Sequence, residues 1–243
     1  MVRHWLLSLV VEHPLSLRWL FPEVEAQGLN VKPIPYRDSE DYATGIRELV
    51  TTGMVKLKSE FPEDDVESVA GVSRVLDRFL ALPKEESHQL RRLARRDERA
   101  QQPSKRVCFE LTKSGGEAWE KVAAPEWGRF VYATTTYSGT DPQREAVGEL
   151  LSLNRDLLIA YMGWYPEVRR EQIKLATIQW ETLTDKEVLY WKRLPFVHRA
   201  SFQTTPAEAR WNSYKEPQWF WEWWVSTCSW HKKPWELPNW PTE

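Results

Sequence analysis

The feature that most constrains this chain is a run of aromatic residues near its C-terminus, Trp-Phe-Trp-Glu-Trp-Trp-Val at 219–225. Written as a helix, Trp219 lies one turn before Trp223 and Phe220 one turn before Trp224, and the other apolar positions cover a third face. Nearly the whole circumference of this helix is therefore apolar. The pattern predicts a segment that must be buried, so the chain has to build a substantial core around it.

Two interpretations of this run stay open, because large aromatic side chains dominate the buried area of cores and of interfaces alike. The indoles either pack in a core, closing over the first half of the chain, or line a groove that binds a partner. The candidate partner-binding residues are Trp219, Trp221, Trp223 and Trp224. Stacking on nucleic-acid bases would need interleaved Lys or Arg, and none occurs between Trp219 and Trp230. Another protein is therefore the partner that the run favours.

Composition excludes several other classes of protein. The 243 residues are 42% hydrophobic and carry 33 Lys+Arg against 35 Asp+Glu, which is a globular composition. No apolar run approaches the roughly 20 residues of a membrane-spanning helix. The two cysteines lie far apart in sequence, and the apolar stretch near the N-terminus has no small-residue cleavage site after it. We therefore expect a cytoplasmic α+β protein that makes no membrane contact, with domains at 1–126 and 127–243.

Short helices and strands alternate in the predicted order of the first half. Val55 and Leu57 alternate with Lys56 and Lys58, as in a half-buried strand. The expected elements are a helix from Asp38 or Ser39 to Gly53, a strand at 54–58, a helix that is capped by Asp64 or Asp65 and ends at Pro83, a helix at 84–96, a charged hairpin at 97–105, a strand at 107–111, and a helix that follows Gly115 and Gly116.

This order of elements resembles a winged-helix domain over residues 38–124. The most specific segment runs from Arg106 to Glu120 and looks like the end of the wing in MarR-like and PadR-like regulators. In those proteins a strand enters a Leu-Thr-x-x-Gly turn, and here Leu111, Thr112 and Gly115 occupy the matching positions. The resemblance implies a third helix in the DNA major groove and a wing against phosphates. The longer string through Trp127 also resembles segments of uncharacterised bacterial proteins, which implies no function.

The expected third helix and hairpin form the most basic stretch of the chain. Residues 91–106 carry seven positive and two negative charges, and the arginine pairs recur every four residues on one helical face. The candidate DNA-binding residues are Arg91, Arg92, Arg95, Arg96, Arg99, Lys105 and Arg106. The competing interpretation is a solvated helix on which Glu85, Glu86, Asp97 and Glu98 pair with these arginines.

A mixed helical and stranded, Trp-rich domain is expected in the second half. Its predicted elements are a strand at 130–137, a helix that begins at Asp141 and Pro142 and ends at Gly163, a further helix from Pro166, a strand at 196–203, and two capping boxes, Thr184 with Glu187 and Thr205 with Glu208. The first helix is the clearest pattern, with Val147, Leu150, Leu151, Leu157, Leu158 and Tyr161 on one face.

Residue patterns typical of catalysis or of cofactor binding are scarce. The adjacent pair Gly115 and Gly116 is not a phosphate-binding loop. Cys228 and His231 have the spacing of half a zinc site, and the other half is missing. The acidic run at 63–65 is adequately explained by the dipole of the helix that follows it. We therefore expect a protein without enzymatic activity, cofactor or metal.

Two functions follow from these patterns, and an enzyme without a sequence signature stays open as a third. The first is a non-enzymatic cytoplasmic protein that recognises another protein through its Trp-rich half, its winged-helix-like module or both. The alternative is a DNA-binding transcriptional regulator that uses residues 91–106 and in which the second half senses a ligand or forms a dimer. The two differ in salt dependence, because phosphate contacts weaken steeply as salt rises and an aromatic protein contact hardly responds.

Overall fold

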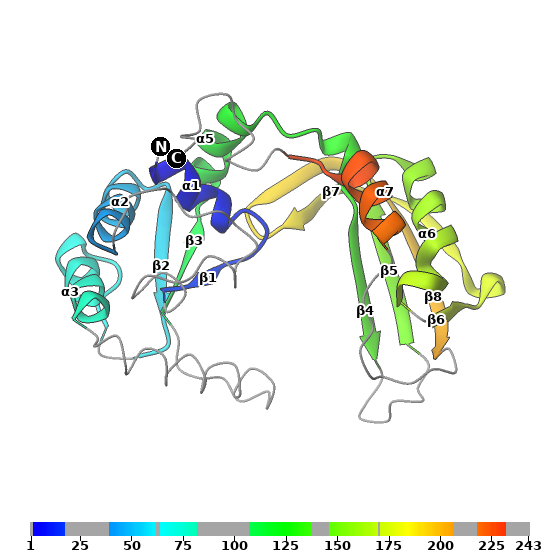
Figure 1. The fold of residues 1–243 in the computed structure, drawn as a ribbon, viewed down its shortest axis with the longest axis horizontal. Coiled ribbons are helices and arrows are strands. Elements are labelled where there is room, and N and C mark those ends of the chain that lie inside the picture. Colours follow the sequence, from blue (N-terminus) through cyan, green and yellow to red (C-terminus); the bar gives the residue numbers. More distant parts are fainter. Residues whose placement is uncertain are drawn as a thin grey trace. The chain divides into compact units, whose positions relative to one another are not determined.

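A computed structural model of the chain describes residues 2–17, 39–61, 64–81, 107–137, 146–169, 171–206 and 218–231. Helices and antiparallel sheets are mixed in it, which confirms the α+β class. The described residues form two compact units, each with its own sheet (Figure 1). Unit 1 contains those within 1–124 together with Leu189–Lys192, and unit 2 contains those within 125–188 and 193–232. In this part of the chain no helix combines the length and the apolar character needed to cross a membrane.

Unit 1 is built on a three-stranded antiparallel sheet of order β1-β3-β2. Its elements are α1 (Val2–Leu9), β1 (Leu15–Ser16), α2 (Ser39–Thr51), β2 (Val55–Ser59), α3 (Val69–Leu80), β3 (Val107–Leu111) and α5 (Lys113–Ala123). Helix α2 packs against α1, α3 and β2, and α1 also packs against α5. Val55 and Leu57 of β2 are buried while Lys56 and Lys58 are exposed, so the alternation expected from the sequence is confirmed.

Helix α3 begins later than the sequence predicts. Ser68, and not Asp64 or Asp65, is its N-cap, because the Ser68 hydroxyl accepts a hydrogen bond from the Gly71 amide at 3.0 Å. Asp65 instead accepts from the Ser68 amide at 3.1 Å, and Asp64 forms an ion pair with Arg78 at 2.8 Å. The acidic residues therefore stabilise the turn before the helix.

Helix α5 contains the two glycines that were expected to precede it. The Thr112 hydroxyl accepts from the Gly115 amide at 3.1 Å, so Thr112 caps the helix, which begins directly after it. Both glycines permit close packing. A Cβ atom at Gly115 would overlap the carbonyl oxygen of Met54, and one at Gly116 would overlap the indole ring of Trp191. The expected helix at 84–96 and the hairpin at 97–105 lie outside the described residues.

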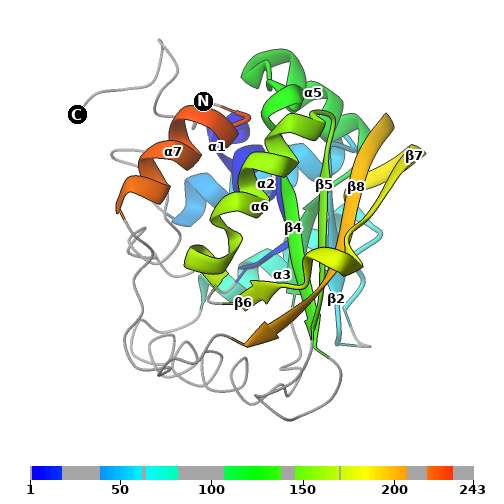
Figure 2. The same cartoon turned by 90° about the vertical axis from the view of Figure 1, so that its right-hand side faces the viewer.

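Unit 2 is built on a five-stranded antiparallel sheet of order β4-β5-β8-β6, in which β7 also pairs with β8. Its elements are η3 (Trp127–Arg129), β4 (Tyr132–Tyr137), β5 (Ala146–Ser152), α6 (Arg155–Arg169), β6 (Glu171–Ile173), η4 (Leu175–Thr177), β7 (Gln179–Leu189), β8 (Lys192–Pro206) and α7 (Gln218–Cys228). Helices α6 and α7 lie on the same face of this sheet (Figure 2). The core between them includes Leu150, Leu158, Tyr165, Phe202 and Phe220.

The helix predicted from Asp141 to Gly163 is wrong, because residues 146–152 form strand β5 and α6 begins only at Arg155. The apolar spacing of β5 fits a helix equally well, but its backbone pairs with β8 and places Gly148 opposite Phe202. A Cβ atom at position 148 would overlap the Phe202 ring, so glycine suits the strand. The expected stop at Gly163 and start at Pro166 are also wrong, since α6 continues through both residues.

The capping box at Thr184 and Glu187 is wrong as well, since both residues lie within strand β7. Thr205 lies in β8, and its predicted partner Glu208 is outside the described residues. The pairing of β7 with β8 makes this region a strand, although its local sequence predicts the start of a helix. The strand expected at 196–203 is confirmed as the middle of the longer β8, and the strand expected at 130–137 is confirmed as β4.

Candidate functional site

Helix α7 lies on unit 2 through one buried face. Phe220 is 4% exposed and Cys228 is 1% exposed, and both belong to the core of the unit. The half-buried Trp224 packs edge-on against Tyr161 of α6, with ring centroids 5.8 Å apart. These contacts fix which side of the helix faces the core, and therefore which side chains point away from it.

Arg129 holds the C-terminal end of α7. Its Nε donates to the carbonyl oxygen of Thr227 at 3.2 Å, and its Nη2 donates to the carbonyl oxygens of Val225 and Ser226. The last carbonyls of a helix have no partner within it, and a cation there also opposes the negative end of the helix dipole. The guanidinium thus anchors α7 from the segment that precedes β4.

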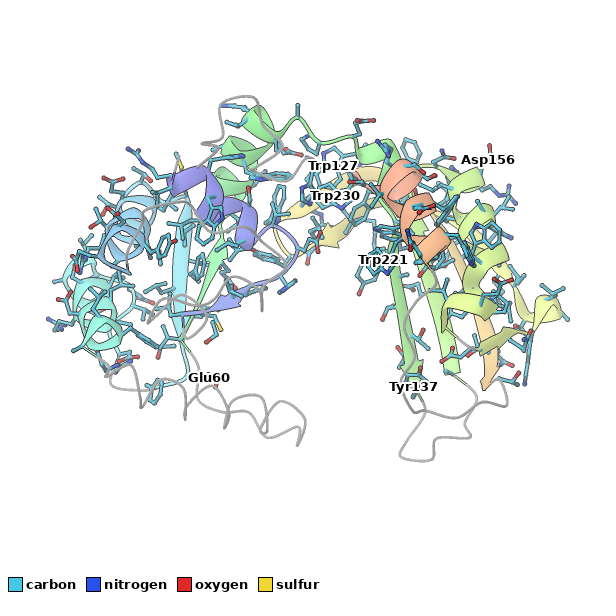
Figure 3. All side chains as sticks on the ribbon, viewed as in Figure 1. Glu60, Trp127, Tyr137, Asp156, Trp221 and Trp230 are labelled. Atoms are coloured by element: carbon cyan, nitrogen blue, oxygen red, sulfur yellow. The ribbon has the colours of Figure 1, made fainter. Side chains whose placement is uncertain are left out.

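The aromatic residues on either side of this anchor also pack together. Trp230, which follows α7, stacks on Trp127 with ring centroids 4.6 Å apart (Figure 3). The Glu126 amide donates to the Trp230 carbonyl oxygen at 2.6 Å. The C-terminal end of α7 and the segment after it are therefore both held against the segment that precedes β4.

Tryptophan side chains remain exposed on both flanks of the buried face of α7. Trp219 is 38% exposed and Trp221 is 49% exposed. On the flank next to α6, Trp219 lies against Trp164, with ring centroids 4.7 Å apart, and Trp164 is itself 36% exposed. The half-buried Trp223 also lies beside Trp164, with ring centroids 6.5 Å apart. We call Trp164, Trp219 and Trp223 the aromatic ridge.

The four candidate partner-binding residues differ in their exposure to solvent. The expectation that the whole run is buried is wrong for Trp219 and Trp221, because α7 is an outer helix and only one of its faces contacts the core. Trp224 points inward and serves the core. Sequence reasoning missed Trp164, because the helix that carries it was predicted to stop at Gly163.

A buried carboxylate links four elements of unit 2. Glu171 accepts hydrogen bonds from the Tyr137 hydroxyl at 2.5 Å, the Thr204 hydroxyl at 2.9 Å and the Tyr165 hydroxyl at 3.3 Å. Thr135 shares a further hydrogen bond with Tyr165 at 2.7 Å. A buried charge is tolerated when its oxygens are satisfied in this way. Glu171 is itself buried, so the group fastens β4, α6, β6 and β8 together.

A second buried carboxylate lies on the sheet of unit 1. Glu110 accepts from Lys58 Nζ at 2.9 Å and from Lys56 Nζ at 3.0 Å. Burial by itself raises the pKa of Glu110, but the hydrogen bonds from Lys58 and Lys56 outweigh it and hold the pKa below its ordinary value. These side chains, with Cys108, line a hollow of about 820 Å³. Both lysines of this hollow are engaged by Glu110, and its lining also carries the carboxylates of Glu60 and Glu67.

The remaining candidate residues do not form a site in the described part of the chain. The proposed DNA-binding set, Arg91, Arg92, Arg95, Arg96, Arg99, Lys105 and Arg106, lies outside the described residues. Cys108 and Cys228 are free thiols, and burial raises the pKa of Cys228 to about 12. Within the described ranges no three His, Cys, Asp or Glu side chains gather into a metal-binding cluster.

The aromatic ridge combines two exposed indoles with the half-buried Trp223 on two packed helices. No protein-family model, no curated protein and no solved structure matches this chain.

Proposed function

We propose that this chain is a non-enzymatic binding protein that recognises another protein through the aromatic ridge. The observation that carries the proposal is the pair of indoles Trp164 and Trp219. Their ring centroids lie 4.7 Å apart, they belong to two helices, and both side chains are more than a third exposed. Large exposed apolar groups on a rigid surface are typical of interaction sites. Tryptophan is also among the residues that contribute most to the binding energy of protein interfaces.

The character of α7 supports a protein partner over a membrane or a nucleic acid. Gln218, Glu222 and Ser226 form a polar stripe along the exposed side of the helix, and Gln218 Nε2 donates to Glu222 at 3.1 Å. No Lys or Arg lies within α7. Membrane-surface helices and base-stacking grooves both need such cations beside their aromatic groups. An apolar centre with a polar rim is instead the usual anatomy of a protein interface.

We also propose that residues 38–124 of unit 1 form a winged-helix-like module. The order α2, β2, α3, β3 and α5 supports this proposal, as does the antiparallel pairing of β2 with β3 and the Thr112 cap of α5. One feature departs from the family, since β3 is flanked on its other side by β1 from the N-terminal segment. Such modules also serve as protein-interaction domains, so the fold agrees with either function.

The test compares the intact chain with the double variant Trp164→Ala/Trp219→Ala as baits in extract of the source cell. We expect the wild type to retain a stoichiometric partner at both low and high salt, and the double variant to lose it. The matched control is Tyr132→Ala, which removes an aromatic side chain of 39% exposure from β4 of the same unit. The proposal is contradicted when the double variant retains the same partner as the control.

Binding of duplex DNA by unit 1 is the competing proposal, and a separate variant tests it. Arg92→Glu together with Arg96→Glu reverses two charges of the basic stretch. If unit 1 binds DNA, the wild type binds random duplex tightly at low salt, loses affinity steeply as salt rises, and is weakened by this variant. If the aromatic ridge is the functional surface, the charge reversal leaves capture of the protein partner unchanged.

A further inference from the structure

Unit 2 has a second surface feature, a pocket on the side of α6 that carries Ile159 and Met162. The pocket has a volume of about 540 Å³ and lies between α6 and the segment that joins β6, η4 and β7. Its lining is mostly apolar and includes Ile159, Met162, Ile173, Leu175 and Ile178. Small-molecule sites are generally concave, mostly apolar and of about 300–1,000 Å³, so this pocket has the size and the surface of such a site.

Two of the apolar side chains that line the pocket are unusually exposed to solvent. Leu175 of η4 is 75% exposed and Ile159 of α6 is 51% exposed, and both line the pocket. A bound apolar group would remove part of both side chains from water, which is favourable by about 25 cal/mol for each Å² covered. The walls therefore favour a ligand with an apolar body.

One cationic side chain is placed among these walls. The guanidinium of Arg155 lies 4.6 Å from the centroid of the Trp180 ring, and both residues line the pocket. Stacking on an indole holds a guanidinium in one orientation and leaves the N–H groups at its edge available. Among the described residues no carboxylate forms an ion pair with Arg155.

Arg155 differs in this respect from other arginines of the same unit. Arg129 lies 3.8 Å from Glu126, Arg193 lies 3.2 Å from Asp185, and Arg199 lies 2.8 Å from Glu149. A guanidinium that is oriented by an aromatic ring and beside an apolar pocket is well placed to take a carboxylate from a ligand, because two parallel N–H groups match the two oxygens.

We propose that this pocket binds a small amphipathic carboxylate, with its apolar body against Ile159, Met162 and Leu175 and its carboxylate on Arg155. The site is separate from the aromatic ridge, which is formed by Trp164, Trp219 and Trp223. The inference does not depend on the proposed protein-binding function, and either one can fail alone.

The test uses 1-naphthoate as the probe and the methionine methyl groups as reporters. The chain has three methionines, of which Met162 lines the pocket and Met54 lies in unit 1. In protein labelled with ¹³C at the methionine methyl groups, we expect 1-naphthoate to shift the Met162 signal through its ring current and to leave the Met54 signal unchanged. The neutral analogue 1-naphthalenemethanol should bind about tenfold more weakly, because it cannot form the charged hydrogen bonds.

Two arginine variants separate the proposed role from a general charge effect. Arg155→Gln should lower the affinity for 1-naphthoate about tenfold and leave the affinity for 1-naphthalenemethanol unchanged. Arg193→Gln, which removes an exposed arginine of the same unit that pairs with Asp185, should change neither affinity. The proposal is overturned if the Met162 signal does not move at millimolar probe, or if the acid and the alcohol bind equally well and Arg155→Gln affects neither.

Discussion

The tryptophans of the two units are used in opposite ways. In unit 1 the described tryptophans Trp5, Trp119 and Trp191 are 3%, 0% and 8% exposed. Two of their indole N–H groups are satisfied within the unit, since Trp119 donates to the Ser8 hydroxyl at 3.1 Å and Trp191 donates to the Val11 carbonyl oxygen at 2.7 Å. Unit 2 buries Trp230 but leaves Trp164, Trp219 and Trp221 between 36% and 49% exposed.

This difference separates a structural role from a binding role for the same residue type. A buried indole contributes through packing and through its satisfied N–H group, so its removal should damage folding. An exposed indole on an outer helix contributes little to folding. Its removal should therefore change stability little and should weaken the binding of a partner. The contrast can be tested one unit at a time.

Trp119→Ala should cause the largest loss of stability. The side chain is fully buried, and it also packs edge-on against Trp191 with ring centroids 6.0 Å apart. We expect the free energy of unfolding of unit 1 to fall by about 3–5 kcal/mol, as is typical of a large aromatic side chain removed from a core. Urea denaturation measures this, and Trp119→Phe serves as a milder control. A loss below about 1 kcal/mol would contradict the assignment of Trp119 to the core.

Gly116→Ala should be the next most damaging change. A Cβ atom at this position would overlap the Trp191 ring, so the ring or the helix has to move, at a cost of about 1–3 kcal/mol. Gly128→Ala is the matched control, because a Cβ atom there meets no other atom within 4 Å. Thermal unfolding of the two variants measures the difference. Equal melting temperatures would show that the Trp191 ring does not pack on α5 as described.

Glu110→Gln should change how the stability of unit 1 depends on pH. The pKa of Glu110 is held below its ordinary value of 4.5, so the folded state binds fewer protons than the unfolded state in acid. Its stabilising contribution is therefore present at neutral pH and is lost as the pH falls below 4.5 through the lowered value. The variant should lose about 1–2 kcal/mol at neutral pH and show a flatter decline in acid, as measured by urea denaturation at several pH values. Parallel pH profiles would refute this account.

Trp219→Ala should have the smallest effect on stability. The side chain is exposed and its ring contacts are with Trp164 and Phe220, so we expect the free energy of unfolding of unit 2 to change by less than about 1 kcal/mol. The half-buried Trp223 provides a comparison within the same helix, since Trp223→Ala should cost more. A large loss of stability from Trp219→Ala alone would contradict the assignment of Trp219 to the binding surface and would assign it to the core.

Local signals were sufficient for much of unit 1. The strand at 55–59 follows from the alternation of Val55 and Leu57 with two lysines. The helix near Gly115 and Gly116 was also expected, although it begins before them, at Lys113. The unpredicted part, β1, pairs with a strand more than 90 residues away, at Leu15 opposite Phe109. Such a short strand has no signal of its own, since its pairing partner defines it.

Unit 2 was predicted less well because its strands depend on distant partners. The apolar residues of β5 fit a helix and a strand equally, and only β8 decides between them. Pro166 suggested a helix boundary, but Tyr161, Tyr165 and Val168 on either side of it are all buried on one face of α6. Their burial maintains the helix across a residue that lacks an N–H group. The aromatic ridge depends on that continuity, because it combines Trp164 of α6 with Trp219 of α7.

The most direct test of the proposed function is the dissociation constant of the captured partner for the wild type and for Trp219→Ala at 50 and 500 mM salt. We predict that the wild-type value changes little with salt and that the variant binds at least about tenfold more weakly at both concentrations, in line with a tryptophan at the centre of an interface. Equal affinities for wild type and variant, or a wild-type affinity that collapses with salt, would contradict the assignment of the aromatic ridge as the binding surface.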